Sequence, residues 1–237
     1  TPHPIGTRKP GFAERNQGRV RPTRKTERNP LNRWRAHGHV TAGVKVQRGK
    51  FIVLEGVDGA GTTTQARLIH ESLEARGMKA VITAQPSLGP IGTLIRAILR
   101  GEVTREDSTP VGPTAIAALF AADRSEHLET QIGPWLEQGY HVICDRYYHS
   151  SLAYQGLELG IEYVAGLNAV MKTPDMIFFV DVDAEVAAGR REQRNSATEL
   201  YEVEVFQTKL RKAYRRAFEL RDGDRVIHLD GNGTIED

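Results

Sequence analysis

Cysteine is nearly absent from this chain of 237 residues, which contains only Cys144. A single cysteine cannot form an internal disulfide, so the chain is not a small secreted protein held together by disulfides. One unpaired cysteine fits a reducing compartment such as the cytosol. Cys144 stands in the apolar run HVIC, which predicts a buried and unreactive thiol.

Long apolar runs are also missing. A transmembrane helix needs about 20 consecutive apolar residues, and the runs here are much shorter. Residues 1–50 contain no apolar stretch of the kind found in secretory signals. These absences predict a cytoplasmic protein that does not contact a membrane.

The net charge of +2 conceals an uneven distribution. Residues 1–50 contain 13 Lys and Arg against 2 acidic residues, whereas residues 51–237 contain 19 against 28. Residues 1–48 are rich in Arg, Pro, Gly and Asn and have no periodicity, so we predict a disordered basic extension. Such a tail can bind nucleic acid through phosphates. An appended leader or upstream extension without that role is the simpler interpretation, and we prefer it.

From residue 49 onward the pattern becomes regular. Segments with helical spacing alternate with runs rich in Val and Ile, and two of these segments end at glycines suited to helix C-caps, Gly77 and Gly139. Alternating strands and helices predict parallel pairing with both faces of the sheet covered. We therefore predict one α/β domain over 49–237, with a five-stranded parallel sheet flanked by helices. The predicted strands are 50–56, 79–84, 141–147, 175–183 and 225–230.

The stretch GVDGAGTTT (56–64) follows the first predicted strand and opens a predicted helix. Its spacing, Gly56-x4-Gly61-Thr62-Thr63, differs from the phosphate-binding P-loop pattern only at Thr62, where lysine is usual. Glycines let the backbone curl so that N–H groups point at an anion, and the helix N-terminus adds positive potential. Thr63 occupies the position whose hydroxyl binds Mg²⁺. The backbone part of the anion site is therefore present, while one mobile cation is absent.

Five separated motifs resemble those of one known family. They are FIVLEGVDGAGTTTQ, QPSLGPIGTLIR, LFAADRSEH, DRYYHSSLAYQG and GRREQRNSATELYE. Their order and spacing resemble the thymidylate (dTMP) kinases over residues 50–237. The resemblance implies a P-loop fold of the nucleoside monophosphate kinase type and transfer of the γ-phosphoryl of ATP to dTMP with Mg²⁺. It also implies a homodimer.

The resemblance implies an acceptor site for dTMP. Asp58 would contact the sugar 3′-hydroxyl, and Arg96 and Arg146 would hold the phosphate. Ser151 and Tyr154 would complete the pocket, with Tyr154 crowding a ribose 2′-hydroxyl. The full acceptor set is Asp58, Pro86, Arg96, Phe120, Arg124, Arg146, Ser151, Tyr154 and Gln155.

The spacing of two residues of the acceptor set also predicts a role for them. Phe120 and Arg124 are four residues apart and share one face of a predicted helix. An aromatic ring beside a guanidinium with several N–H donors suits a flat base with a carbonyl edge. The resemblance implies that Phe120 stacks on thymine and that Arg124 hydrogen-bonds to its edge. A core phenylalanine and a structural arginine–glutamate pair are the alternative for the same residues.

The resemblance also implies a donor site for ATP. We predict that Thr63 and Asp145 bind Mg²⁺, and that Arg194 supplies the charge that Thr62 lacks. Asp58, Arg146 and Arg194 form the predicted catalytic set. The ATP-binding set comprises Gly56, Val57, Asp58, Gly59, Ala60, Gly61, Thr62, Thr63 and Thr64, with Arg190, Arg191 and Arg194 on or beside a mobile lid at about 189–200.

The chain departs from the family at Thr62 and at Gln85, which stands in Ala-Gln-Pro where the family usually has Arg-Glu-Pro. These changes leave open a relative that binds nucleotides but turns over poorly. A kinase for another nucleoside monophosphate is a further alternative, although Phe120, Arg124 and Tyr154 favour a deoxy-pyrimidine. None of the eight histidines belongs to a metal-ligand pattern, and we assign them no role. A stripe on the last long helix is predicted to pack into the core: Phe206, Leu210, Ala213 and Ala217.

Overall fold

The computed structural model describes residues 47–192 and 200–234. Most of the predicted basic extension and part of the predicted lid, Arg194 included, lie outside these residues. Two residues assigned to the extension, Gln47 and Arg48, are described. The guanidinium of Arg48 lies 3.0 Å from the carboxylate of Asp175, next to the first strand.

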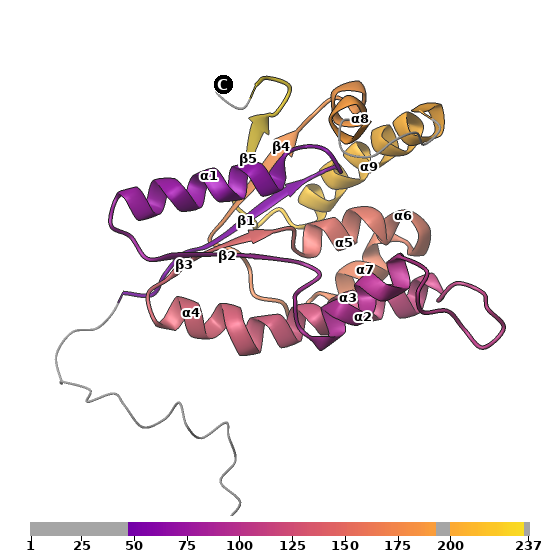
Figure 1. Cartoon of the computed structure of the whole chain (residues 1–237), viewed down its shortest axis with the longest axis horizontal. Helices are drawn as coiled ribbons and strands as arrows, with labels where there is room; N and C mark the ends of the chain where they lie inside the picture. The colour runs from indigo at the N-terminus through magenta and orange to yellow at the C-terminus, as the bar shows by residue number, and fades with distance from the viewer. Residues whose placement is uncertain (1–46, 193–199, 235–237) are drawn as a thin grey trace, which may run out of the picture. The chain divides into compact units, whose positions relative to one another are not determined.

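The predicted five-stranded parallel sheet is confirmed (Figure 1). All four neighbouring pairs run parallel, in the order β2-β3-β1-β4-β5. The third strand ends two residues earlier than predicted because Arg146 has a φ of 70°, which an extended strand cannot contain. The strands are β1 (Phe51–Gly56), β2 (Ala80–Ala84), β3 (His141–Asp145), β4 (Met176–Asp181) and β5 (Val226–Asp230).

Helices connect the strands. The segment with helical spacing that ends at Gly139 consists of α3, a π-helical turn at Leu128–Ile132 and then α4. Pro134 has no N–H to donate to the preceding turn, which accounts for the irregularity just before it. The helices are α1 (Thr62–Ala75), α2 (Pro90–Leu99), α3 (Pro113–His127), α4 (Gly133–Glu137), α5 (Tyr148–Tyr154), α6 (Gly156–Leu159), α7 (Ile161–Leu167), α8 (Ala184–Glu192) and α9 (Leu200–Leu220).

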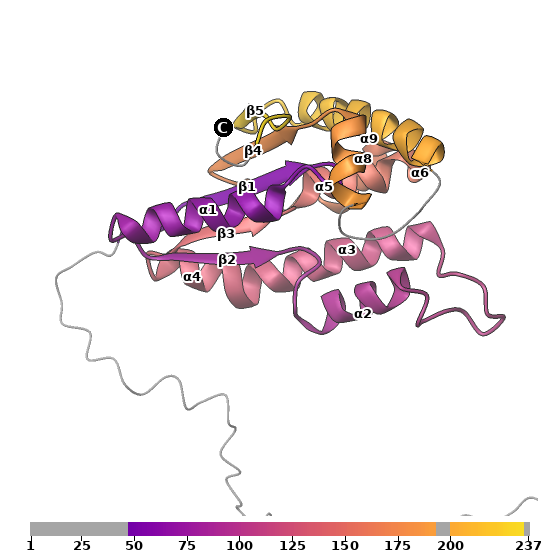
Figure 2. The same ribbon diagram turned by 45° about the horizontal axis from the view of Figure 1, so that its top comes forward.

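Helices lie on both faces of the sheet (Figure 2), and alternation along the strands divides the core into two layers. Phe51 and Val53 of β1 pack with residues of α4, α5, α7 and α9, whereas Leu54 packs with Ala66 of α1 on the opposite face. Because successive strand residues point to opposite faces, one apolar strand supplies both layers. Cys144 is fully buried in the first layer, so the prediction of a buried cysteine is confirmed, and burial raises the pKa of its thiol well above the usual value.

The predicted apolar stripe on α9 is only partly buried. Leu210 and Ala217 are buried in the core, but Phe206 is 44% exposed, so its assignment to the core is wrong. Phe206 lies four residues before Leu210, which belongs to a buried cluster with Phe179 and Val180 of β4. Its ring centroid lies 6.4 Å from that of Tyr154, near the carboxyl end of the sheet.

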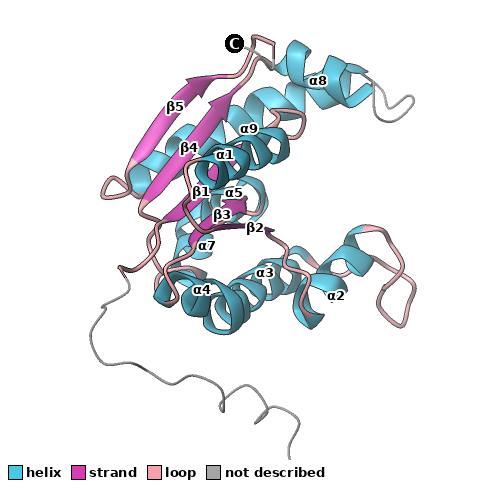
Figure 3. Ribbon diagram, turned by 60° about the vertical axis from the view of Figure 1, so that its left-hand side comes forward, coloured by secondary structure: helices cyan, strands magenta, loops and turns pink. Residues whose placement is uncertain are grey.

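The topology creates a binding position at the carboxyl end of β1. The chain leaves β1 toward β2 and β3 on one side and returns to β4 and β5 on the other, as Figure 3 shows. In open parallel sheets, ligands bind where the strand order reverses in this way. The loops 57–61 and 146–147 follow β1 and β3 at this position.

Candidate functional site

The loop after β1 has the backbone of an anion site. Gly59 and Gly61 have φ values of 92° and 96°, which favour glycine. A Cβ on Gly56 would stand 2.9 Å from the Cβ of Ala60 and 3.0 Å from the carbonyl oxygen of Val180, so a side chain does not fit there. The helix α1 begins at Thr62 without a side-chain cap, which leaves its first N–H groups directed at the loop.

Thr62 is buried beneath this loop, with 6% of its surface exposed. Its methyl group lies 3.2 Å from the position that a Cβ on Gly56 would take. The side chain therefore packs under the loop as a small residue. It offers no charge to a phosphate, and a hydroxyl is a much weaker partner than an ammonium.

Thr63 and Asp145 lie together at the ends of α1 and β3. The hydroxyl of Thr63 donates a hydrogen bond to Oδ2 of Asp145. Oδ1 of the same carboxylate is buried and has no partner within the described residues. One hydroxyl and one carboxylate fit Mg²⁺, which takes few protein ligands and retains waters and phosphate oxygens. No cluster of three or more candidate metal ligands occurs among residues 47–192 and 200–234.

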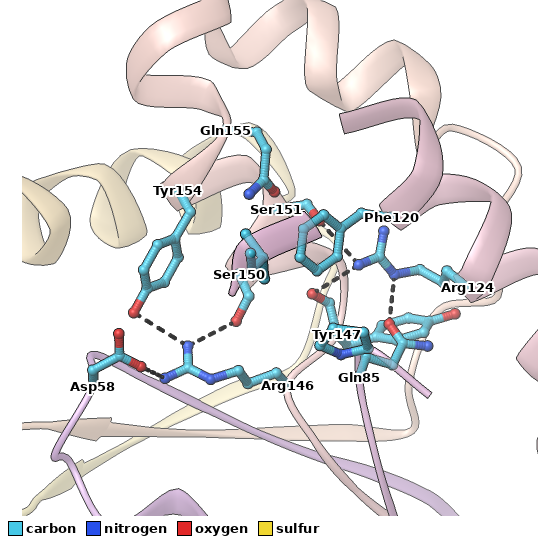
Figure 4. Close-up of a pocket in the computed structure, with 12 residues that line it drawn as sticks. Asp58, Gln85, Phe120, Arg124, Arg146, Tyr147, Ser150, Ser151, Tyr154 and Gln155 are labelled. Atoms are coloured by element: carbon cyan, nitrogen blue, oxygen red, sulfur yellow. Dashed lines mark hydrogen bonds and ion pairs between the residues drawn. The ribbon is translucent and has the colours of Figure 1, made fainter. Parts of the chain in front are cut away.

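A cavity of about 310 Å³ lies beside the loop (Figure 4). Eight of the nine predicted acceptor residues line it, although they come from four separate parts of the chain. They are Asp58, Pro86, Phe120, Arg124, Arg146, Ser151, Tyr154 and Gln155. The lining also includes residues without a predicted role, namely Gln85, Leu99, Tyr147 and Ser150. The roles of these residues toward a ligand stay predictions.

One end of the cavity carries Arg146. Its Nη2 donates to Oδ1 of Asp58 at 2.7 Å, so the arginine touches the P-loop. Burial lowers the pKa of Arg146, but the surrounding Tyr214, Tyr154 and Asp58 outweigh this effect and raise it. The guanidinium therefore stays charged. It lies 5.4 Å from the ring centre of Tyr154, close enough for a cation–π contact.

The other end carries Arg124, which is 1% exposed. Its guanidinium donates to the side chains of Gln85 and Ser151, at 2.8 and 3.0 Å. It also donates to Asn168 Oδ1 and to the carbonyl oxygen of Tyr147. All four acceptors are neutral. Burial lowers the pKa of Arg124, while nearby Tyr147 and Glu55 oppose the effect. A buried arginine without a carboxylate in contact favours a ligand with carbonyl oxygens or negative charge.

Gln85, which replaces the family glutamate, lies between Arg124 and His127 at this end of the cavity. Because arginine only donates, Oε1 of Gln85 accepts from Arg124 and Nε2 faces Nδ1 of His127 at 3.4 Å. The other ring nitrogen of His127 then carries its hydrogen and donates to the hydroxyl of Thr83 at 2.8 Å. Burial lowers the pKa of His127, which fits a neutral ring. The sequence does not indicate a role for His127 because its partners, Thr83 and Gln85, are distant from it in the chain.

Two predicted arginines have other partners in the structure. Arg96 donates to the carbonyl oxygens of Pro86 and Ser87 and is absent from the cavity lining. Arg190 donates to the carbonyl oxygens of Gly231 and Gly233, at 2.8 and 2.7 Å, after β5. The side chain of Arg191, like the whole of Arg194, lies outside the described residues.

Comparison with known proteins places these features in one family. The family model described as thymidylate kinase matches residues 54–237. The chain belongs to the thymidylate kinase family. A Treponema pallidum (strain Nichols) protein, provisionally named a thymidylate kinase, is 40% identical over 192 residues, which are 78% of this chain and 89% of that protein. A "Probable thymidylate kinase" of Pyrococcus horikoshii is 38% identical over 80% of this chain and 92% of its own length.

A third relative, a "Probable thymidylate kinase" of Thermococcus kodakarensis, is 39% identical over 75% of this chain and 88% of its own length. The thymidylate kinase family thus accounts for nearly the whole described part of the chain. None of the described helices is long and apolar enough to cross a membrane.

Proposed function

We propose that the chain transfers the γ-phosphoryl group of ATP to dTMP, giving dTDP and ADP. The single observation that carries this proposal is the position of Asp58. It belongs to the P-loop and also lines the cavity, where it contacts Arg146 at 2.7 Å. A nucleotide held by the loop and a nucleoside monophosphate held in the cavity would therefore meet at this pair.

The cavity suits dTMP as the acceptor. Phe120 offers an aromatic face to the base, and Arg124 offers guanidinium donors to its carbonyl edge. At the other end, Arg146 would bind the acceptor phosphate and Asp58 the sugar 3′-hydroxyl. Tyr154 lies beside Arg146, where its ring would crowd a ribose 2′-hydroxyl.

The donor phosphates would bind to the N–H groups of the loop and of the first turn of α1. Phosphoryl transfer requires position and positive charge rather than a covalent intermediate. Thr63 and Asp145 would hold Mg²⁺, which supplies positive charge to the β- and γ-phosphate oxygens when bound. We retain Arg194 as the predicted replacement for the missing lysine, because Arg190 is bound to carbonyl oxygens.

The buried Thr62 favours a second candidate, a family member that binds both nucleotides but turns over slowly. The homodimer, the cytosolic location and nucleic-acid binding through the basic extension stay predictions from the sequence. A different nucleoside monophosphate as acceptor is the remaining alternative.

A coupled assay of ADP release tests the proposal. The full chain with ATP and Mg²⁺ is expected to release ADP only when an acceptor is added, with dTMP preferred over dUMP, dCMP and UMP. An Arg146→Met variant is the negative control, because it removes the charge at the predicted phosphate position. Release that does not depend on any acceptor, or binding of both nucleotides without release, would contradict kinase activity. Preference for another acceptor would contradict dTMP.

A further inference from the structure

A buried tyrosine hydroxyl joins three elements beside the predicted site. Tyr214 of α9 is fully buried, and its hydroxyl lies 3.0 Å from the carbonyl oxygen of Gly56 at the end of β1. The same hydroxyl lies 3.2 Å from Nη1 of Arg146 and 2.9 Å from Oγ of Ser150. Tyr214 does not line the cavity, so it reaches the ligand site through Arg146 and Ser150, which both line it.

Glu55, the residue before Gly56, accepts the other hydrogens at this junction. Its Oε1 accepts the backbone N–H groups of Tyr147 and Ser150, at 2.9 and 3.2 Å. Its Oε2 accepts the Ser150 hydroxyl at 2.6 Å and lies 3.2 Å from the Tyr214 hydroxyl. The carboxylate therefore holds the turn after β3 against the start of the P-loop.

Counting hydrogens assigns each donor. The short contact to a carboxylate takes the proton of Ser150, so Ser150 Oγ and Tyr214 Oη remain as acceptors for Arg146. The proton of Tyr214 goes to Gly56 or Glu55, both at the end of β1, or to Ser150 Oγ. Burial raises the pKa of Tyr214 well above its usual value, with Glu55 adding to the effect, so the hydroxyl keeps this proton.

We propose that Tyr214 is a positioning residue, whose hydroxyl fixes the Arg146 guanidinium relative to the first residue of the P-loop. The backbone of Arg146 has a φ of 70° at the turn after β3. From there its side chain must reach Asp58 in the loop after β1, so the position of the guanidinium depends on its hydrogen-bond partners. Nη2 donates to Asp58, and the two N–H groups of Nη1 are shared among the hydroxyls of Ser150, Tyr154 and Tyr214, at 3.2, 3.4 and 3.2 Å, which holds the plane of the guanidinium. The proposal rests on the proposed role of Arg146 in binding the acceptor phosphate.

The ring of Tyr214 has a separate, packing role. Its centroid lies 5.2 Å from that of Phe179 and 6.1 Å from that of Phe218. A Tyr214→Phe change keeps these contacts and removes only the hydroxyl. Tyr148→Phe is the matched control, because Tyr148 is also fully buried and its hydroxyl donates to Asp224 at 2.7 Å, away from the cavity lining.

A double-mutant cycle with Arg146→Lys tests the proposal, because lysine cannot reproduce the forked contacts to Asp58 and Tyr214. Tyr214→Phe is expected to lower kcat/KM for dTMP by roughly tenfold or more, the usual effect of losing a hydrogen bond to a charged group. In the Arg146→Lys background the same change should cost less than about twofold. Tyr148→Phe should lower kcat/KM equally in both backgrounds, if at all. The same fold-loss for Tyr214→Phe in both backgrounds, or no loss when Arg146 is unchanged, would overturn the proposal.

A second measurement separates this proposal from the proposed function. The rotation of the Arg146 guanidinium can be followed by ¹⁵N-edited NMR without any nucleotide. It should become faster in Tyr214→Phe and remain unchanged in Tyr148→Phe. Unchanged rotation in Tyr214→Phe would overturn the positioning role even if the kinase is active. An inactive wild-type chain with this NMR response would instead contradict the proposed function alone.

Discussion

Changing Gln85 to glutamate tests how the base end of the cavity is held. Gln85 is 5% exposed and lies between Arg124, at 2.8 Å, and His127, at 3.4 Å. A carboxylate there accepts from both neighbours but cannot donate. His127 must then carry a hydrogen on Nδ1 for the carboxylate, either as the other neutral tautomer, with the Thr83 hydroxyl donating to Nε2, or as the imidazolium, which the new negative charge favours. The new carboxylate should therefore raise the pKa of His127.

The size of the effect follows from proton linkage. In the wild type, burial lowers the pKa of His127 in the folded chain. As pH falls, His127 is therefore protonated in the unfolded chain at a higher pH than in the folded chain. The free energy of unfolding then falls as pH drops below about 6.5. At one pH unit below that value, this loss is at most about 1.4 kcal/mol. In Gln85→Glu the pKa of His127 is raised. The contribution of His127 is then present below about pH 6.5 and is lost as pH rises through the new pKa.

Urea unfolding at about pH 7.5, 6.5 and 5.5 measures this difference. The free energy of unfolding of Gln85→Glu, relative to the wild type, should increase by about 1 kcal/mol or more toward acid pH. Gln138→Glu is the control, because it makes the same change at an exposed glutamine. Parallel pH dependence of the wild type and Gln85→Glu would refute the placement of Gln85 between the arginine and the histidine.

Three further predictions concern the loop, the cavity and the core. Thr62→Lys is expected to raise kcat in the coupled assay by about 10-fold or more, because it restores a charged hydrogen bond near the phosphates; an unchanged kcat in a folded variant would contradict this. Phe120→Ala should weaken dTMP binding, measured by calorimetry, by about 1–3 kcal/mol of stacking energy with ATP binding unchanged; equal losses for both nucleotides would contradict it. Burial raises the pKa of Asp224, but His149 and Tyr148 outweigh burial and lower it. The contribution of Asp224 to the free energy of unfolding is therefore present above about pH 3.9 and is lost as pH falls. Asp224→Asn should lower the free energy of unfolding by about 1–3 kcal/mol at neutral pH, measured by urea unfolding. Equal stability of wild type and variant at neutral pH would contradict that assignment.

Much of the fold could be predicted because the apolar runs report both the strands and the burial of both sheet faces. Five Val- and Ile-rich runs separated by helical segments leave little choice except a covered parallel sheet. Strand ends were less predictable. The run 141–147 continues in apolar and aromatic residues, and nothing in its composition announces the positive φ of Arg146. Phe206 was misassigned because helical periodicity indicates which face of α9 a residue shares, and not how far along the helix that face is covered.

The candidate site was predictable where local sequence carries the chemistry. The glycines of the loop, and the spacing of Phe120 and Arg124 on one helix, are local features that family motifs preserve. Arg96 shows the limit of such reasoning. Its guanidinium bends back to the carbonyl oxygens of Pro86 and Ser87, a choice that depends on how the loop before α2 folds.

By itself, the sequence determined the sheet, the phosphate loop without its lysine and the family, because each of these depends on short runs of neighbouring residues. The tertiary structure alone decided which distant side chains support the site. Tyr214 meets Arg146 across 68 residues, and His127 meets Gln85 across 42. The physical reason is that a hydrogen bond forms within about 3 Å. Such a distance depends on strand register and helix packing, which no short stretch of sequence contains.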